Sequence, residues 1–181
     1  IKKDVFQLNE IRRKLYHQIG YKDIISEDEL SVQDWDGICE YKKLSEEFIR
    51  EFEDKIDWVI VSRNQTLSEG FIREFKNDVF WHYVSGCQIL SEDFIREFED
   101  KLTWRYISEY QNLSENFIVE FQNNIDWHVY FKRQRASFQI IKKFIVKTSY
   151  NDTNQFTTSH LTNKEKEEIE KLLKLRNLFI K

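Results

Sequence analysis

The stretch LSEDFIREFEDKLTWRYISEYQN, residues 90–112, decides the fold of this chain because similar copies of it recur every 23 residues. All five tryptophans keep this spacing, at Trp35, Trp58, Trp81, Trp104 and Trp127. Glutamines keep it as well, at Gln65, Gln88, Gln111 and Gln134. A fixed period of about 20–50 residues is typical of solenoids and other repeat architectures.

The first part of each copy has the pattern of an amphipathic helix, which we call helix A. It opens with Leu-Ser-Glu, and serine is a favoured N-cap while an acidic residue suits the N-terminal end of the helix dipole. Apolar residues then lie on one stripe of a 3.6-residue period, in the first copy at Phe48, Ile49, Phe52 and Ile56. Acid–base pairs spaced to support a helix follow the same phase: Glu46–Arg50, Glu69–Arg73 and Glu92–Arg96.

The second part of each copy predicts a shorter helix, helix B, that begins near the tryptophan. Asp57, Thr103 and Asp126 precede a tryptophan and can cap this helix. A unit this small cannot bury its own apolar face, so neighbouring copies have to stack. We therefore predict an all-α fold, a solenoid of short two-helix repeats with atypical capping helices at both ends.

The ends of the chain depart from the repeat. Residues 1–33 predict a capping helix, from Asp4 to Ile19 with Gly20 at its end, and a connector. Tandem repeats occupy residues 34–150, and the last copy is degenerate. Residues 151–181 predict a loop and a capping helix that opens on a Thr162–Glu165 capping box. We expect all three parts to form one folded unit.

Aromatic residues in phase with the repeat predict the core. A ladder of tryptophans could also form a stacking platform for bases or sugars, but its phase with the apolar residues favours core packing. Besides the five tryptophans, the predicted core contains Phe48, Phe52, Phe71, Phe75, Phe94, Phe98, Phe117 and Phe121.

The copies differ most in the part of helix B that packing does not specify. Tyrosine and arginine, which are frequent in protein interfaces, occur at these positions. The candidate partner face consists of Arg63, Tyr83, Arg105, Tyr106, Tyr110, Lys132 and Arg133. Neutral drift at exposed positions would also produce this variation, and the sequence leaves the two explanations equally open.

Composition narrows the class of function. The chain of 181 residues is 40% hydrophobic and 33% charged, which favours a folded protein over a disordered one. No apolar run approaches the roughly 20 residues of a transmembrane helix. A formal net charge of −4 disfavours general affinity for nucleic acid. Residues 131–147, however, carry six basic residues and no acid, so a polyanion or an acidic subunit could bind there. A solvated last repeat is the simpler explanation.

No pattern in the chain predicts catalysis or a cofactor. Cys39 and Cys87 form no metal-binding pair and favour a reduced, intracellular setting, where we expect them to be small, semi-buried fillers. His82 and His128 each follow a tryptophan but lie two copies apart. We therefore expect no catalytic residue, no metal site and no cofactor.

The repeated consensus, Leu-Ser-Glu-x-Phe-Ile-x-Glu-Phe followed by Asp-Trp-x-x-Ile-Ser-x-x-Gln, resembles tandem repeats in many uncharacterised proteins of giant, amoeba-infecting DNA viruses of the mimivirus kind. Residues 34–134 carry it well and residues 137–150 carry a decayed copy. The resemblance implies a viral, intracellular protein of the host cytoplasm or the virion, and it implies no activity.

The sequence thus predicts a non-catalytic protein-interaction scaffold or adaptor. The alternative is a structural or assembly component of a virion, built by self-association of the repeats. In either case we expect a protein partner and no binding to nucleic acid or membrane.

Overall fold

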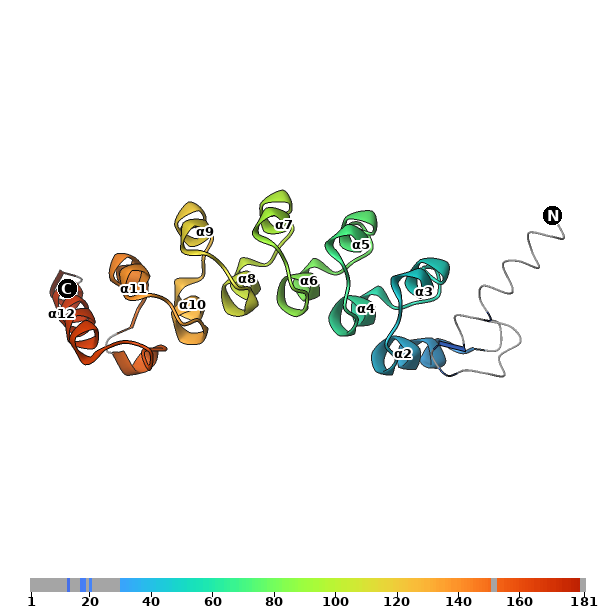
Figure 1. Ribbon diagram of the computed structural model, residues 1–181, viewed down its shortest axis with the longest axis horizontal. Helices are drawn as coiled ribbons and strands as arrows, with labels where there is room; N and C mark the ends of the chain where they lie inside the picture. Colours follow the sequence, from blue (N-terminus) through green and yellow to red (C-terminus); the bar gives the residue numbers. More distant parts are fainter. Residues whose placement is uncertain (1–12, 14–16, 19, 21–29, 151–152, 180–181) are drawn as a thin grey trace. The chain divides into compact units, whose positions relative to one another are not determined.

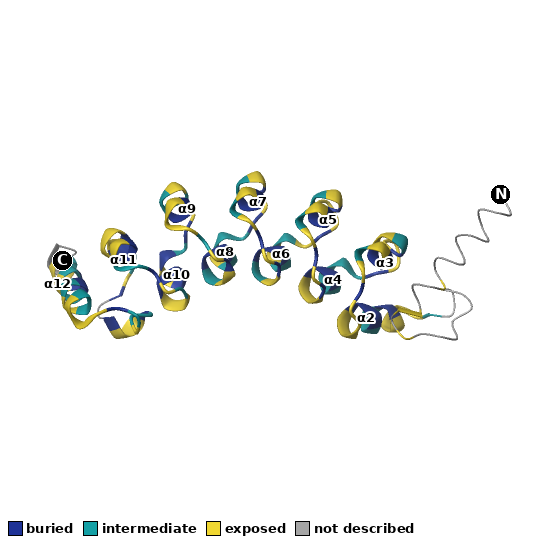
Figure 2. Ribbon diagram, viewed as in Figure 1, coloured by how far each residue is buried: buried dark blue, intermediate teal, exposed yellow. Residues whose placement is uncertain are grey.

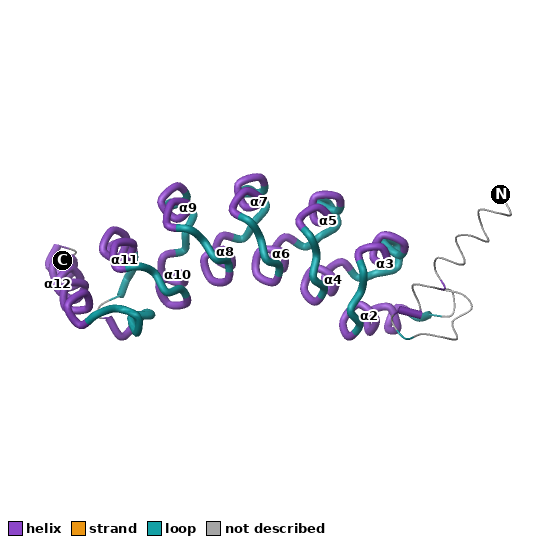
Figure 3. Tube along the Cα trace, viewed as in Figure 1, coloured by secondary structure: helices purple, strands orange, loops and turns teal. Residues whose placement is uncertain are grey.

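The computed structural model of the chain describes residues 13, 17–18, 20, 30–150 and 153–179. Over these residues it contains helices, turns and loops and no β-strand, as Figure 3 shows. Short helix pairs recur at regular spacing (Figure 1), which confirms the predicted all-α solenoid of two-helix repeats. The described helices include none with the length and apolar character that crossing a membrane requires.

Two kinds of short helix alternate along the repeats. The A helices are α3 (Glu46–Glu51), α5 (Glu69–Glu74), α7 (Glu92–Glu97), α9 (Glu115–Glu120) and α11 (Phe138–Phe144). The B helices are α2 (Val32–Tyr41), α4 (Trp58–Asn64), α6 (Trp81–Cys87), α8 (Trp104–Tyr110) and α10 (Trp127–Arg133). In the three repeats that begin at α3, α5 and α7, helix A has six residues and helix B seven. The prediction that helix A is the longer of the two was therefore wrong.

Helix A ends early because the chain enters a hydrogen-bonded turn at Phe52. The N–H groups of Lys55 and Ile56 both donate to the Phe52 carbonyl, with N···O distances of 2.9 and 3.2 Å. The turn keeps Ile56 buried together with Phe48 and Ile49. The predicted apolar stripe is thus buried as a whole, although its last residue belongs to the turn and not to the helix.

Side-chain caps fix where most of the helices begin. In all five A helices a serine hydroxyl accepts the N–H of the residue three positions later: Ser45, Ser68, Ser91, Ser114 and Ser137. Asp57 and Asp126 cap α4 and α10 in the same manner. Thr103 makes no side-chain cap at α8, so this part of the prediction was wrong.

The internal contacts divide the chain into two compact units, residues 1–88 and 89–181. In the first unit, α4 packs between α2 and α6, with α3 and α5 in a second row (Figure 1). In the second unit, α10 packs against α8, while α11 continues into the 3₁₀ turn η2 (Ile145–Lys147). The expectation that the chain folds as one unit concerns folding cooperativity and stays a prediction.

The core of each unit lies between the A and the B helices, where Figure 2 shows the buried residues. In the second unit this core continues into the last helix, α12 (Asn163–Phe179), which packs against α11, η2 and the 3₁₀ turn η3 (Thr153–Gln155). Phe131, Phe144 and Ile169 belong to one buried cluster there. The C-terminal helix is therefore part of the fold and not an appendage.

The two ends agree only in part with their predictions. The helix predicted from Asp4 to Ile19 lies largely outside the described residues, although Gly20 has the positive φ, 86°, expected just after a helix end. Helix α2 begins at Val32 on a capping box of Ser31 and Asp34, so the predicted boundary between residues 33 and 34 falls inside a helix. The predicted Thr162–Glu165 capping box is confirmed, since each residue accepts the other's N–H.

Candidate protein-interaction surface

The five tryptophans do not share one environment. Trp35 and Trp127 are buried, whereas Trp58, Trp81 and Trp104 are half-buried. The indole N–H groups of Trp58, Trp81, Trp104 and Trp127 each donate to the carbonyl five residues earlier, with N···O distances of 3.0–3.2 Å. The indole closes the turn after helix A, and this keeps one ring edge near the surface. The expected burial therefore needs correction for the three middle tryptophans.

The predicted phenylalanines line the interior between the helix rows. Phe121 is half-buried, and the others are buried. Within a repeat the two rings lie next to each other, with centroids 4.6 Å apart for Phe71 and Phe75, and Trp58 packs on Phe75 at 4.9 Å. These aromatic positions are occupied by packing and are not free to bind a ligand.

Glutamines in the 23-residue phase bond successive repeats to each other. The Gln88 side chain is buried, and its Oε1 accepts the Leu67 N–H at 2.9 Å. Its Nε2 donates to the carbonyls of Ser62 and Gln65 at 3.0 and 2.7 Å. Gln65 makes the same three contacts one repeat earlier, to Leu44, Cys39 and Lys42. The phase of these residues was visible in the sequence, but their role was not predicted.

The ladder has equivalent members in the second unit. Gln111 accepts the Leu90 N–H at 3.1 Å, and Gln134 donates to the carbonyls of Glu109 and Gln111 at 2.9 and 3.4 Å. The signal that could have identified these residues is a polar, uncharged side chain that stays constant between variable neighbours.

A second buried polar position lies four residues after each of the three middle tryptophans, at Ser62, Ser85 and Ser108. The Ser62 hydroxyl accepts the Phe80 N–H at 3.0 Å, and the Ser108 hydroxyl accepts the Asp126 N–H at 2.9 Å. Cys39 occupies this position in the first repeat, where burial raises the pKa of its thiol to about 11 against the opposing effect of a backbone hydrogen bond. Cys39 is buried and Cys87 exposed, so neither is the semi-buried filler that the sequence predicted.

Charged residues of the A helices also link neighbouring repeats. The predicted i,i+4 pairs are present, for example Arg96–Glu92 at 3.8 Å. Arg96 in addition reaches the next repeat, where it pairs with Glu120 at 2.9 Å and lies over the Phe117 ring at 4.9 Å from its centroid. The hydrogen bond from Arg96 holds the pKa of Glu120 below its ordinary value. Such exposed pairs contribute about 0–1 kcal/mol each.

In the first unit, the predicted partner face consists of two residues in contact, Arg63 and Tyr83. Arg63 of α4 is exposed, and its guanidinium lies 5.8 Å from the centroid of the half-buried Tyr83 ring on α6. Arg63 also lies 3.9 Å from Glu40 of α2. The arginine is thus held between two neighbouring B helices.

In the second unit, the predicted partner face covers α8 and α10. The rings of Tyr106 and Tyr110 stack with centroids 6.0 Å apart and an interplanar angle of 21°. Arg133 pairs with Glu109 at 3.1 Å, and a hydrogen bond with Glu109 also raises the pKa of Tyr110. Arg105 lies 3.5 Å from Asp126, and Lys132 is exposed. These contacts order the exposed groups before any partner binds.

The described residues offer no recognisable metal chemistry, since no three histidine, cysteine, aspartate or glutamate side chains among them converge on a common point. Neither a family model, nor a curated protein, nor a solved structure matches this chain.

Proposed function

We propose that this chain is a non-catalytic protein-interaction scaffold whose partner face lies on the B helices. The observation that carries the proposal is the stacked pair of Tyr106 and Tyr110 on α8. Tyr110 is 56% exposed, although the apolar interior of the repeats is already filled by other residues. Two aromatic rings held in place at a surface lose little conformational freedom on binding, which favours affinity.

The chemistry of this surface fits a protein partner. Tyrosine and arginine are enriched among the residues that contribute most to binding between proteins. The candidate partner face contains both kinds of residue in each unit, beside side chains that vary from repeat to repeat. The repeats thus separate two tasks, since constant residues hold neighbours together while variable residues face outward.

The resemblance to repeats of giant, amoeba-infecting viruses suggests where to search for the partner. A host protein or a virion protein is the first class to test, and a location in the host cytoplasm or the virion belongs to the same proposal.

Affinity purification from expressing cells, followed by mass spectrometry, tests the proposal. The wild-type chain is compared with a variant that combines Tyr83→Ala, Tyr106→Ala and Tyr110→Ala. We expect recovery of the specific partner to fall at least roughly tenfold, which corresponds to a loss of about 1.4 kcal/mol or more. Ile89→Ala is the control, because it truncates another exposed apolar side chain and should leave recovery unchanged.

Melting curves of all three proteins show whether each variant is folded. A folded triple variant that recovers the same proteins as the wild type would contradict the proposed partner face.

A further inference from the structure

Charge is distributed unevenly along this chain. Residues 30–126 contain 21 acidic and 10 basic residues, a formal charge of −11. Residues 127–181 contain 12 basic and 5 acidic residues, a formal charge of +7. Opposite charges of this size on one molecule can attract a second copy of it.

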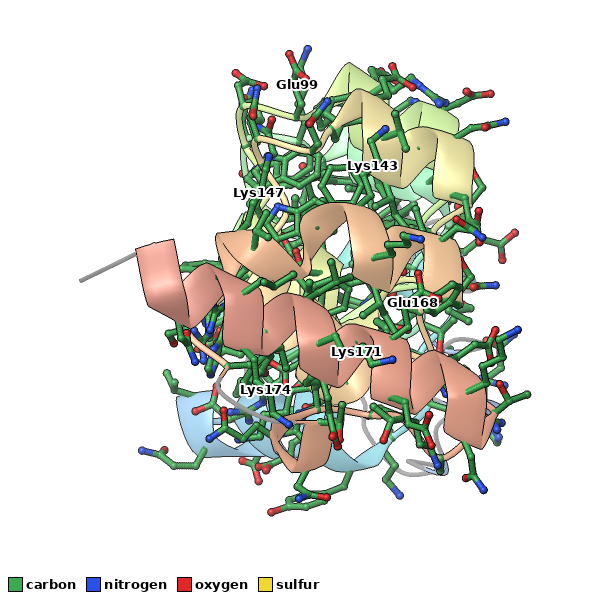
Figure 4. All side chains as sticks on the ribbon, turned by 90° about the vertical axis from the view of Figure 1, so that its left-hand side faces the viewer. Glu99, Lys143, Lys147, Glu168, Lys171 and Lys174 are labelled. Atoms are coloured by element: carbon green, nitrogen blue, oxygen red, sulfur yellow. The ribbon has the colours of Figure 1, made fainter. Side chains whose placement is uncertain are left out.

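Four exposed lysines gather at the C-terminal end of the second unit (Figure 4). We call them the lysine face, which consists of Lys143, Lys147, Lys171 and Lys174. The first two belong to α11 and η2, and the other two to α12. Arg176 of α12 fixes these elements to each other, because its guanidinium donates to the carbonyls of Ile145 and Thr148 at 3.4 and 2.6 Å.

The described carboxylates of the second unit form no ion pair with the lysine face. Glu168, the nearest labelled acid in Figure 4, is already paired with Lys142. Lys147 donates to the Gln122 carbonyl at 3.3 Å, and Lys143 lies over the Phe144 ring. Within the described part of the chain, no lysine of this face forms an ion pair with a carboxylate.

The complementary charge of this unit lies in the turn that follows α7. We call it the acidic turn, which consists of Glu99 and Asp100. Both residues are exposed. In Figure 4, Glu99 lies at the opposite edge of the second unit from Lys171 and Lys174. The acidic turn of this unit therefore does not cover its own lysine face.

We propose that the lysine face docks on the acidic turn of a second copy of this chain. Val146 and Leu175, next to these lysines in sequence, are exposed and add apolar area to the contact. Because the two docking surfaces differ and lie at opposite edges of the unit, each copy can bind one neighbour through its lysine face and another through its acidic turn, and repetition of this contact builds chains of molecules. The docking surfaces share no residue with the partner face on the B helices.

Sedimentation velocity of the full chain at low and high salt tests the proposal. We expect chains of molecules at about 30 mM salt and monomers at about 500 mM, because salt screens contacts between exposed charges. The apparent dissociation constant of self-association should rise at least roughly tenfold over this range.

A charge-swap experiment identifies the two surfaces. One variant carries glutamate at the four positions of the lysine face, and another carries lysine at the two positions of the acidic turn. Each variant alone should be monomeric at low salt, and an equimolar mixture of the two should associate again. Lys171→Glu with Lys174→Glu is then compared with Lys43→Glu with Lys76→Glu, which changes the net charge equally in the first unit. Only the former pair should weaken association.

The proposal is overturned if the folded wild-type chain is monomeric at low salt, or if the lysine-face variant associates as the wild type does. It is also overturned if a labelled single-stranded oligonucleotide binds the lysine face while the chain itself stays monomeric, since the face would then serve a nucleic acid. Circular dichroism of each variant confirms that it is folded before it is compared.

Discussion

A buried glutamine contributes more to the stacking of these repeats than the charged pairs on the surface. The Gln88 side chain satisfies the Leu67 N–H at the start of its own repeat and two carbonyl groups of the preceding repeat. A buried backbone group left without a partner costs about 1–3 kcal/mol, whereas an exposed ion pair contributes about 0–1 kcal/mol. Arg96 and Glu120 are both more than one-third exposed, so their pairing adds little beyond local order.

Replacement of this glutamine tests that comparison. Gln88→Leu keeps a side chain of similar bulk but removes all three hydrogen bonds, so the free energy of unfolding should fall by about 3 kcal/mol. Urea unfolding followed by circular dichroism measures the change. Gln139→Leu is the control at an exposed position and should stay within about 0.5 kcal/mol of the wild type. Equal transition midpoints for the two variants would show that the glutamine ladder is dispensable.

The burial of the phenylalanines was predicted from the sequence, whereas the role of the buried glutamines was not, and the difference has a physical reason. Phe48 and Phe94 reveal themselves by their period, because burial of apolar area needs only the correct face of a helix. Gln88 bonds to main-chain atoms, which are the same in every residue and leave no mark in the sequence. The half-buried indole of Trp104 escaped prediction similarly, since its acceptor is the carbonyl of Glu99.

At the scale of single elements, the N-cap residues of the A helices and of most B helices differ in the backbone angle ψ. The serine caps of the A helices have ψ near 155°, as at Ser91. The cap residues of the B helices α4, α8 and α10 have ψ of 109° at Asp57, 98° at Thr103 and 89° at Asp126, whereas Ser31 of α2 has ψ of 167°. The two aspartates cap on this backbone, whereas the shorter Thr103 side chain does not. Side-chain reach therefore explains why the predicted threonine cap failed.

The missing cap of α8 offers a stabilising substitution. Thr103→Asp should supply the cap seen at Asp57 and Asp126 and place a negative charge at the helix N-terminus, raising stability by about 1 kcal/mol. A shift of the urea midpoint to higher concentration measures the effect. Asp126→Ala should move the midpoint in the opposite direction by a similar amount. A Thr103→Asp midpoint at or below that of the wild type would refute the reach argument.

Element boundaries were harder to predict than element types. A stripe of period 3.6 continues to Ile56, and the sequence cannot show that this residue reaches the core from a turn. The early start of α2 was readable in principle, because Ser31 and Asp34 have the spacing of a capping box. The repeat pattern concealed this early start, because it places the beginning of helix B at the tryptophan.

At the scale of the whole molecule, the C-terminal segment continues the hydrogen bonding of the glutamine ladder with residues other than glutamine. Thr157 stands 23 residues after Gln134, and its N–H and hydroxyl donate to the carbonyls of Phe131 and Lys132, each at 2.9 Å. His160 contacts the Ala136 carbonyl at 2.6 Å. The segment before α12 thus offers substitutes for the next glutamine of the ladder, and α12 covers the last apolar face. A stacked array needs such an end to shield its final repeat from water.

Loosening this end tests how far stability is transmitted along the chain. Ile169→Ala combined with Leu173→Ala removes two buried side chains of α12 and should cost about 2–5 kcal/mol per site. In a stacked array each repeat contacts only its neighbours, so hydrogen exchange measured by mass spectrometry should accelerate in residues 153–179 and in α11, and much less in residues 30–88. The exposed Leu175, changed to alanine, should leave the exchange pattern of the wild type unaltered. Equal acceleration in α11 and in residues 30–88 would instead mean that the chain opens as a single cooperative unit, and that neighbour contacts alone do not set its local stability.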